Sequence, residues 1–563
     1  MKITLTTSGQ SFDLSQGDYV AGGGEGKIYR KGSTAFKIYH DPAKMIPLGK
    51  IQALCALTPK NVLAPRDICE SNRKKVGFTM KYIADRIYLC WMFNKMWKQK
   101  NNIDIGLLNF LINKMRETTI ILHQEGCVVG DYNELQFLVD KKFSDVYFCD
   151  ANSYQIKGYP CTAIMDTVRD RTVPFGSFSE KTDWFGFAIV TSQLFTGIHP
   201  YQGNHPNFSR REIKELILMD KGLSIFNKNV TLPRQAEPLN TIPKSLRGWY
   251  EAVLEKKERT IPPTANDLVS VIIQPRTIVQ GTDSFMVKEI ISLPEPIINA
   301  QVINGIIYCI TKKAIYKDNK VLAYITNAEY AVIINKGSIE PLIVKRYGTE
   351  LTVNDKGNEL ISLHPDDYFI HLGKLYTISN GKVILNTAEK LGVLTIISPK
   401  VMANIFESSY KVYQGVVVQD IVGIPWIVVP AENVCHNIQI SELTGHRVLD
   451  AKYDEGGDLR MCIIISEFKS KYYKSLIIFK KGGPSNGYDI KSTDTINSDI
   501  ANFTILNKSV AACIVGDERL DLITQHGTKE IQDPPFDSSM QLFTDGVRVL
   551  VINGSKILHI STK

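Results

Sequence analysis

The most informative stretch of the sequence is HQEGCVVGDYNELQFLVDKKFSDVYFCD, residues 123–150. After a helical segment, Asp131 stands in a short polar loop. The apolar runs 137–139 and 146–149 are typical of two strands joined by a turn, and Asp150 ends the second of them. Two acids on either side of a hairpin can converge on one pocket. That layout suits phosphoryl transfer, in which one carboxylate orients a hydroxyl and the other holds a metal on the phosphates.

The bulk composition indicates a globular protein of more than one domain. The chain has 563 residues, 44% hydrophobic and 22% charged, with a mild net charge of +8, so no nucleic-acid partner is expected. The ten cysteines form no Cys-x-x-Cys pair, which argues against a zinc site or a disulfide framework. Residues 1–14 lack the apolar core of a signal peptide, and the most apolar window, Val412–Pro430, contains polar residues, Gly and Pro. We expect a cytoplasmic protein without membrane association.

The N-terminal region carries a glycine-rich segment, Ala21–Gly26, followed by a strand pattern, Thr34–Ile38, with one cation, Lys37. Glycines let a backbone approach phosphate oxygens closely, although such hairpins are also common flexible turns. A lysine on an otherwise buried strand needs a partner, and a nucleotide phosphate is one candidate; an edge lysine that reaches solvent is the alternative. Further on, Ile105–Leu122 and the run that begins at Asp183 have helical patterns.

Together these positions resemble a protein kinase domain over Met1–Ile273. The resemblance is carried by the order and spacing of Gly23, Gly24, Gly26, Lys37, Asp131, Asp150 and Asp183. The match is close to a bacterial and phage group of kinase-like proteins, which read Gly-Asp-x-Asn where eukaryotic kinases read His-Arg-Asp. That group also has an Asp-Trp-Phe helix and a His-Pro-Tyr-x-Gly element, here residues 199–203. The resemblance implies an α+β bilobal domain, with 1–84 as the N-lobe and 85–273 as the C-lobe.

The resemblance also implies a role for each matching residue. The catalytic residues would be Asp131, Lys37 and Asn133. ATP would be held by Gly23, Gly24, Gly26, Lys37, the gatekeeper Met80, and Lys81 and Ile83 of the hinge. Magnesium, or manganese, would be held by Asp150 and Gln136. Asp183 would brace the catalytic loop, and Arg259 would be a buried structural arginine.

The chain departs from the kinase pattern near the chemistry. Gln136 stands where the second metal ligand is usually Asn. No Asp or Glu lies within residues 43–65, where a helix-borne partner of Lys37 is expected, and Gln52 is the nearest polar substitute. Residues 150–182 lack Asp-Phe-Gly and a clear Ala-Pro-Glu. These departures keep open a kinase fold that binds without transferring phosphate.

The rest of the chain predicts an all-β domain. A linker is expected at 274–288, and beyond it short β-branched and aromatic runs recur between Gly, Asn and Asp turns. Asn-Gly turn pairs stand at residues 304, 380, 486 and 553. About seven strand clusters, each of about forty residues, favour a β-propeller of about six or seven blades over 289–563, with a two-sheet sandwich array as the alternative.

The predicted function is that of an ATP- and magnesium-dependent protein kinase, of the Ser/Thr class by family type, whose propeller recruits a protein substrate or partner. The alternative from another class is a pseudokinase–propeller scaffold, or a structural component of a larger assembly, a phage particle included. If the protein is phage-encoded, the host cytoplasm or the virion is the expected location. A kinase fold that acts on a small molecule, or that attaches AMP, is the third possibility.

Overall fold

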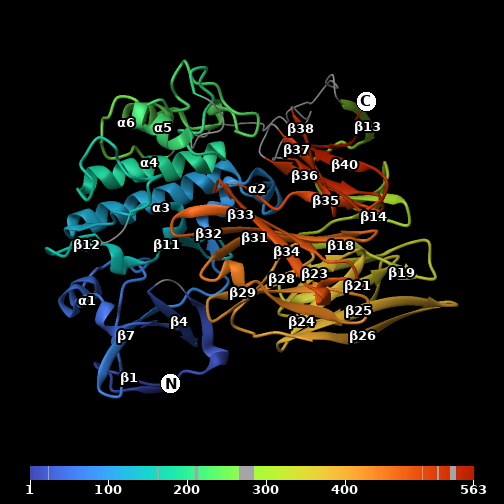
Figure 1. Ribbon diagram of the computed structural model, residues 1–563, viewed down its shortest axis with the longest axis horizontal. Coiled ribbons are helices and arrows are strands. Elements are labelled where there is room, and N and C mark those ends of the chain that lie inside the picture. The colour runs from blue at the N-terminus through green and yellow to red at the C-terminus, as the bar shows by residue number, and fades with distance from the viewer. Residues whose placement is uncertain are drawn as a thin grey trace. The chain divides into compact units, whose positions relative to one another are not determined.

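A computed structural model describes residues 1–22, 25–161, 164–208, 214–265, 285–497, 499–515, 519–532 and 540–562. The chain divides into two compact units, Met1–Ile273 and Gln274–Lys563, and strands predominate over helices (Figure 1). Gly23, Gly24 and most of the expected linker lie outside the described residues. The expected end of that linker, Lys288, is wrong, because strand β13 (Phe285–Ser292) already begins at Phe285 and pairs there with the last strand.

The first unit begins with an antiparallel sheet of seven strands in the order β2-β1-β6-β7-β5-β4-β3. The strands are β1 (Lys2–Leu5), β2 (Ser11–Asp13), β3 (Tyr19–Gly22), β4 (Gly26–Lys31), β5 (Thr34–Tyr39), β6 (Ile68–Ser71) and β7 (Lys74–Lys81). Helix α1 (Leu48–Cys55) begins after Pro47, whose fixed φ suits a helix start. Its Ile51 packs against Tyr39 and Phe78 of the sheet, which fixes α1 beside Lys37 on β5.

Helices dominate the rest of the first unit: α2 (Lys95–Lys100), α3 (Ile105–Gln124), α4 (Glu180–Thr196), α5 (Lys214–Lys221) and α6 (Lys244–Leu254). The predicted helices at Ile105–Leu122 and from Asp183 onward are confirmed by α3 and α4. The carboxylate of Asp104 caps α3 by accepting the amide of Leu107 at 2.8 Å. Every residue of α4 from Thr182 to Thr196 is buried, Asp183 and Gln193 included, and the helix contacts both α3 and α6.

Short strands between α3 and α4 carry the two acids. β10 (Phe137–Val139) pairs with β11 (Val146–Phe148) and with β8 (Ile87–Tyr88), and β9 (Cys127–Val128) pairs with β12 (Gln155–Ile156). The predicted hairpin is therefore confirmed. Asp131 lies in the loop between β9 and β10, and Asp150 follows β11.

The described part of the second unit forms seven antiparallel sheets, mostly of four strands, in chain order. They are β13 (Phe285–Ser292), β41 (Lys556–Thr562), β40 (Val549–Asn553) and β39 (Gln541–Thr544); β14 (Ile297–Ile303), β15 (Ile306–Thr311), β16 (Ala314–Lys317) and β17 (Lys320–Tyr324); β18 (Glu329–Ile333), β20 (Leu342–Tyr347), β21 (Glu350–Asp355) and β22 (Asn358–Leu363); β23 (Asp367–His371), β24 (Lys374–Ser379), β25 (Lys382–Leu391) and β26 (Leu394–Asn404), joined by the short parallel β19 (Asn335–Lys336); β27 (Tyr410–Val412), β28 (Val417–Ile421), β29 (Ile424–Pro430) and β30 (Cys435–Gln439); β31 (Arg447–Gly456), β32 (Leu459–Phe468), β33 (Lys471–Phe479) and β34 (Tyr488–Thr495); β35 (Phe503–Leu506), β36 (Val510–Val515), β37 (Arg519–Thr524) and β38 (Gly527–Gln532).

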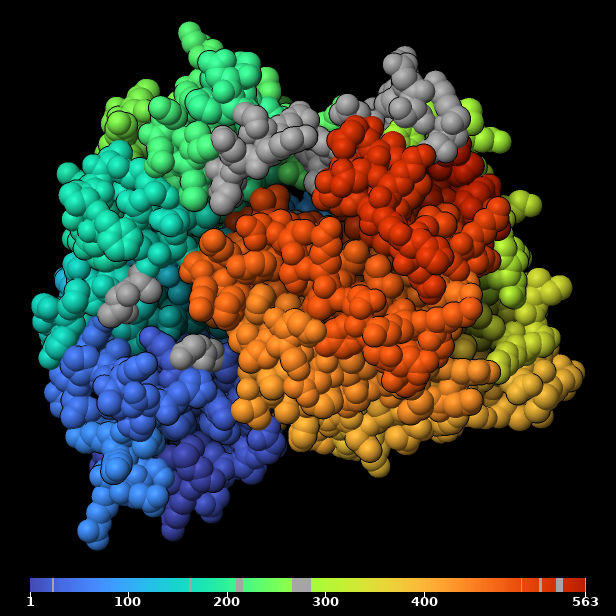
Figure 2. Space-filling view, viewed as in Figure 1, coloured from blue at the N-terminus to red at the C-terminus, as the bar shows by residue number. Residues whose placement is uncertain are grey.

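Apolar clusters join each sheet to the next one. Successive side chains of a strand face opposite sides, so Val417 of β28 packs with the preceding sheet while Val418 packs with the following one. Another cluster joins the sheet of β35–β38 to that of β13 and β39–β41, for example through Ile514 and Leu542. The latter sheet packs in turn against β14–β16. The succession of clusters therefore returns to its start, and neighbouring sheets lie side by side (orange to red in Figure 2).

The apolar window Val412–Pro430 includes the hairpin of β28 and β29. Across the described ranges, no helix is long and apolar enough to cross a membrane.

Candidate functional site

Lys37 is a buried cation at the centre of the first unit, with 8% of its surface exposed. Its Nζ donates to Glu25 Oε2 at 2.6 Å and to Asn152 Oδ1 at 3.2 Å. Asp150 Oδ1 lies 3.6 Å away. Burial alone lowers the pKa of Lys37, but the nearby carboxylates of Asp150 and Glu25 outweigh it and raise the pKa above its ordinary value. Lys37 is therefore held charged by groups from two separate parts of the unit.

Helix α1 does not supply the partner of Lys37. The expectation that Gln52 substitutes for a helix-borne acid is wrong, because Gln52 is exposed and Glu25 makes the short contact instead. α1 carries a buried cation, Lys50, whose Nζ donates to the carbonyl oxygen of Pro160 at 3.1 Å. The helix thus contacts the segment after β12 through a lysine.

Asp131 lies in the loop that leads into β10, with 7% of its surface exposed. Its Oδ1 accepts the backbone amide of Met165 at 2.9 Å. Burial raises the pKa of Asp131, and hydrogen bonds from Asn133, Met165 and Gln136 offset this only in part. The side chain of Asn133 also caps the 3₁₀-helix η4 (Glu134–Gln136) by accepting the amide of Leu135 at 2.8 Å. Asn133 therefore shapes the loop and contacts the candidate base.

Asp150 has a left-handed backbone conformation, with φ 56° and ψ 33°. For most residues other than glycine this conformation costs about 1–2 kcal/mol, and aspartate adopts it more readily than most. The amide of Ser153 donates to the carbonyl of Asp150 at 3.0 Å, which closes the turn into the 3₁₀-helix η5 (Ala151–Ser153). The Asp150 side chain is 44% exposed. Its carboxylate is thus accessible while its backbone is held in place.

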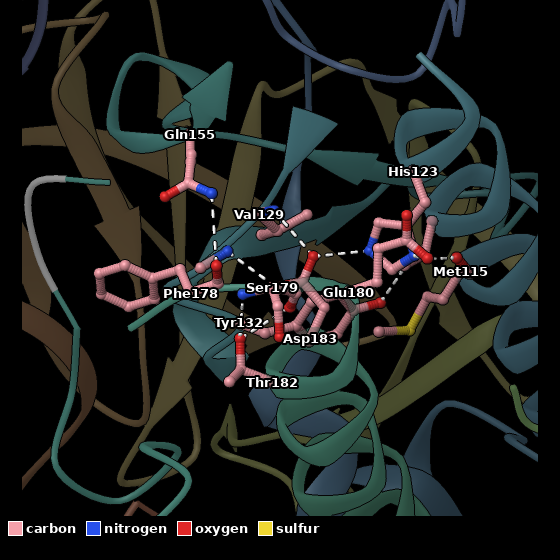
Figure 3. Close-up of polar contacts among 12 residues, drawn as sticks. Met115, His123, Val129, Tyr132, Gln155, Phe178, Ser179, Glu180, Thr182 and Asp183 are labelled. Atoms are coloured by element: carbon pink, nitrogen blue, oxygen red, sulfur yellow. Dashed lines mark hydrogen bonds and ion pairs between the residues drawn. The ribbon is translucent and has the colours of Figure 1, made fainter. Parts of the chain in front are cut away.

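Asp183 of α4 braces the loop that carries Asp131 (Figure 3). Its fully buried carboxylate accepts the amides of Val129 and Gly130 and bonds Nε2 of His123, each at 2.8 Å. A Cβ on Gly186, one turn along α4, would overlap the side chain of the loop residue Tyr132. This close approach explains why α4 carries a glycine in its buried run.

Replacing Asp183 by asparagine is expected to destabilise the first unit by about 1–3 kcal/mol. The amide nitrogen of asparagine cannot accept a hydrogen bond, so a backbone amide of the loop would stay buried and unpaired. The unfolding transition of the first unit, followed in urea, measures the effect. Glu117→Gln, at an exposed position of α3 outside these contacts, is the control, and equal transitions for the two variants would contradict the bracing role.

Two of the expected nucleotide-binding residues, Met80 and Ile83, belong to apolar clusters. Met80 packs on the cluster around Ile51 and Phe78, and Ile83 is buried with Leu63 and Leu138 of β10. The ammonium of Lys81 lies 4.8 Å above the ring of Tyr147. The residues at and just after the end of β7 therefore contact the β10–β11 hairpin.

Gly26 has a packing role in the glycine-rich hairpin. A Cβ on Gly26 would overlap the carbonyl oxygen of Ile38 on the paired strand β5. Glycine is therefore required for the close approach of β4 and β5, whether or not a phosphate binds there.

Asp150 and Gln136 would hold the expected magnesium. The carboxylate of Asp150 is open to solvent, and the Gln136 amide lies between Asp131 and Cys149. No group of three or more His, Cys, Asp or Glu side chains that could hold a metal occurs within the described ranges. Mg²⁺ is usually bound by one or two protein oxygens together with waters and substrate phosphates, so these two residues fit it.

The side chain of Arg259 is largely covered, with 8% of its surface exposed, and pairs with Asp170. Its guanidinium makes two bonds to the Asp170 carboxylate, at 2.7 and 2.9 Å, and a third to the carbonyl of Val253. These contacts lower the pKa of Asp170, although burial opposes them. Asp170 lies within the segment between the hairpin and α4, so this ion pair joins that segment to the chain that follows α6.

His199, just beyond α4, contacts the same segment. Its Nε2 donates to the carbonyl of Thr167 at 2.9 Å, and burial lowers its pKa to about 4. The unfolded chain takes up a proton on this histidine near pH 6.5, whereas the folded chain does so only near pH 4. The contribution of His199 to the stability of the folded chain is therefore complete above pH 6.5 and is lost as the pH falls toward 4.

The stability of the first unit is expected to fall by up to about 3 kcal/mol between pH 6.5 and pH 4 through His199 alone. Urea unfolding at pH 7.5, 6, 5 and 4 measures this. His199→Gln should be less stable at neutral pH but should depend less on pH over that range, and parallel profiles for the two proteins would refute the assignment.

Sequence reasoning missed Glu25, Asn152 and Asp170. Each lies in or beside a part of the chain that the sequence did single out: Glu25 in the glycine-rich segment, Asn152 just after Asp150, and Asp170 in the segment before α4. No spacing rule connects them to Lys37 or Arg259. The available signal was that each buried cation needs an acidic or polar partner, which could be sought among the acids and amides near the candidate site.

A scan against models of protein families finds none that matches the chain, and a search of curated proteins finds no match either. A functional assignment therefore depends on the geometry of the site.

Proposed function

We propose that the first unit is a kinase-like phosphotransferase related to the bacterial and phage group that the sequence resembles. The main support is that Lys37, buried on β5, lies 3.6 Å from Asp150 after β11, and that Asp150 is close enough to Asp131 to affect its pKa. A buried lysine, an accessible carboxylate and a buried carboxylate from three separate elements support the roles of phosphate ligand, metal ligand and base that we propose for them.

The reaction transfers the γ-phosphoryl group of ATP to a hydroxyl. The acceptor oxygen forms a bond to the γ-phosphorus, the bond to the β–γ bridging oxygen breaks, and its electron pair leaves with ADP. Asp131 takes the proton of the hydroxyl, and Lys37 binds phosphate oxygens. Asp150 and Gln136 would hold Mg²⁺, which would neutralise charge on the phosphates when bound. Met80 and Ile83 would lie beside the adenine ring of the bound nucleotide.

We propose a protein Ser or Thr residue as the acceptor and a seven-bladed β-propeller as the recruiting domain. The seven successive sheets and the closed succession of clusters between them support a propeller, because a ring leaves only short, protected edges. The pairing of Phe285 in β13 with Thr562 in β41 supports the same closure.

Labelled nucleotide tests this function directly. The full-length protein is incubated with Mg²⁺ or Mn²⁺ and either γ-labelled or α-labelled ATP, beside a panel of Ser, Thr and Tyr peptides. Transfer of the γ-label, lost in Asp150→Ala, is expected. Transfer of the α-label would indicate AMP attachment instead. No transfer of either label, with no rise in melting temperature on adding ATP, would refute an enzymatic function.

A pseudokinase scaffold is the second candidate, and two contacts favour it. Asp131 is covered by the amide of Met165, and Lys37 is already bonded to Glu25 and Asn152. In this conformation the candidate base is engaged within the chain. Binding of ATP without transfer, seen as a raised melting temperature in the same assay, would support the scaffold.

A further inference from the structure

The ammonium group of Lys37 has three N–H bonds, and two of them are committed to close partners. These are Glu25 Oε2 at 2.6 Å and Asn152 Oδ1 at 3.2 Å. The 3.6 Å separation from Asp150 is too long for a hydrogen bond but suits an ion pair. Counting only contacts with described residues, one N–H is therefore left for Asp150 or for a phosphate oxygen.

The acid that orients such a lysine cannot come from helix α1. Within residues 43–65 the chain has no Asp or Glu, and the charged residue of α1, Lys50, is buried and bonded to Pro160. Helix α1 therefore brings a second buried cation to this part of the unit and no acid.

The carboxylate that contacts Lys37 is that of Glu25, in the glycine-rich hairpin. It directly precedes β4, and its Oε2 also lies 3.5 Å from Nδ2 of Asn152. Lys37, Glu25 and Asn152 thus form a triangle of contacts that joins the β4–β5 hairpin to η5, the turn that follows Asp150. Replacing Glu25 would therefore alter the contacts both of Lys37 and of the η5 turn that follows Asp150.

We propose that Glu25 is the positioning residue of the site: it holds the ammonium of Lys37 toward the phosphates of the bound nucleotide. This inference rests on the proposed function, since it concerns the lysine that binds ATP. When Asp150 binds Mg²⁺, Glu25 is the carboxylate that still compensates the buried charge of Lys37. The contact that opens for the phosphate is the long one to Asp150, and the two short contacts stay.

A blocking role for Glu25 makes the opposite prediction. Its side chain is 57% exposed, so it could also leave and let the phosphates take its place. A positioning residue, when removed, weakens both binding and transfer, whereas a blocking residue, when removed, tightens ATP binding. The two roles therefore differ in the sign of the change in KM.

The test is steady-state transfer of the γ-label by full-length Glu25→Gln, with Glu25→Asp as the conservative variant. We expect kcat/KM for ATP to fall about 10- to 100-fold in Glu25→Gln, with a raised KM and a lowered kcat, and to recover in part in Glu25→Asp. Glu70→Gln is the matched control, because Glu70 is a partly exposed carboxylate of β6 in the same sheet. A lowered KM, or unchanged constants, in Glu25→Gln would overturn the positioning role.

A second measurement does not depend on catalysis. Melting temperatures of Glu25→Gln, Lys37→Met and the double variant, without nucleotide, report whether the two side chains act together. Their shifts should be non-additive by about 2–4 °C, and additive shifts would overturn the contact. If the variants show non-additive shifts but the wild-type protein transfers no label, the proposed function fails while the Glu25–Lys37 contact stands.

Discussion

Asp131→Asn is expected to lower the rate of γ-phosphate transfer by about 10²–10⁴-fold. Asparagine keeps the size of the side chain and can still accept the amide of Met165, but it cannot take a proton from the acceptor hydroxyl. The melting temperature should therefore change little while the activity is lost. Transfer of the γ-label to a peptide, measured with saturating ATP, gives the rate.

Asp140→Asn is the control for this change. Asp140 lies in the turn of the same hairpin and accepts the amides of Lys142 and Ser144, which asparagine can also do through its carbonyl oxygen. Its activity should equal that of the wild-type protein. An Asp131→Asn variant with similar activity would show that Asp131 is not the base.

Arg259→Met is expected to destabilise the first unit by about 3–5 kcal/mol. The Arg259 side chain is 8% exposed and that of Asp170 is 2% exposed, so removing the cation leaves a buried carboxylate without its partner. The lowered pKa of Asp170 would then rise, because burial would no longer be opposed by the guanidinium. Urea unfolding at pH 7, followed by a signal from the first unit, measures the loss.

The double variant Arg259→Met with Asp170→Asn tests the cause. Removing both charges should cost less than the sum of the two single changes, because neither partner is then left charged and buried. Arg247→Met, at a half-exposed salt bridge of α6, should change the stability by less than about 1 kcal/mol. Additive costs would show that Arg259 stabilises the unit through packing rather than through the ion pair.

Much of the first unit follows from local sequence patterns. The apolar spacing of Ile105–Leu122 and the long apolar run after Asp183 predict α3 and α4, because both patterns repeat over several helical turns. The hairpin between Asp131 and Asp150 follows in the same way from two apolar runs and a polar turn. In the second unit, alternating apolar residues and Asn-Gly pairs predict short antiparallel strands.

Partners distant in the chain could not be predicted in this way. Gln52 was the nearest polar residue on the expected helix, yet the carboxylate that contacts Lys37 is Glu25, twelve residues before it. Asn152, 115 residues further along, completes the contact. The sequence positions of Glu25 and Asn152 do not predict that they contact Lys37, because these contacts depend on how β5, the hairpin and η5 pack together.

The sequence by itself determined which residues can perform chemistry and on which local elements they lie: a lysine on a buried strand, and two acids bracketing a hairpin. Local periodicity suffices for this, because helices and strands repeat every few residues. Only the tertiary structure decided which charges compensate one another, with Glu25 beside Lys37, Asp170 beside Arg259, and Lys50 bonded to a carbonyl. A buried charge requires a partner, but any residue that the fold brings near can supply it.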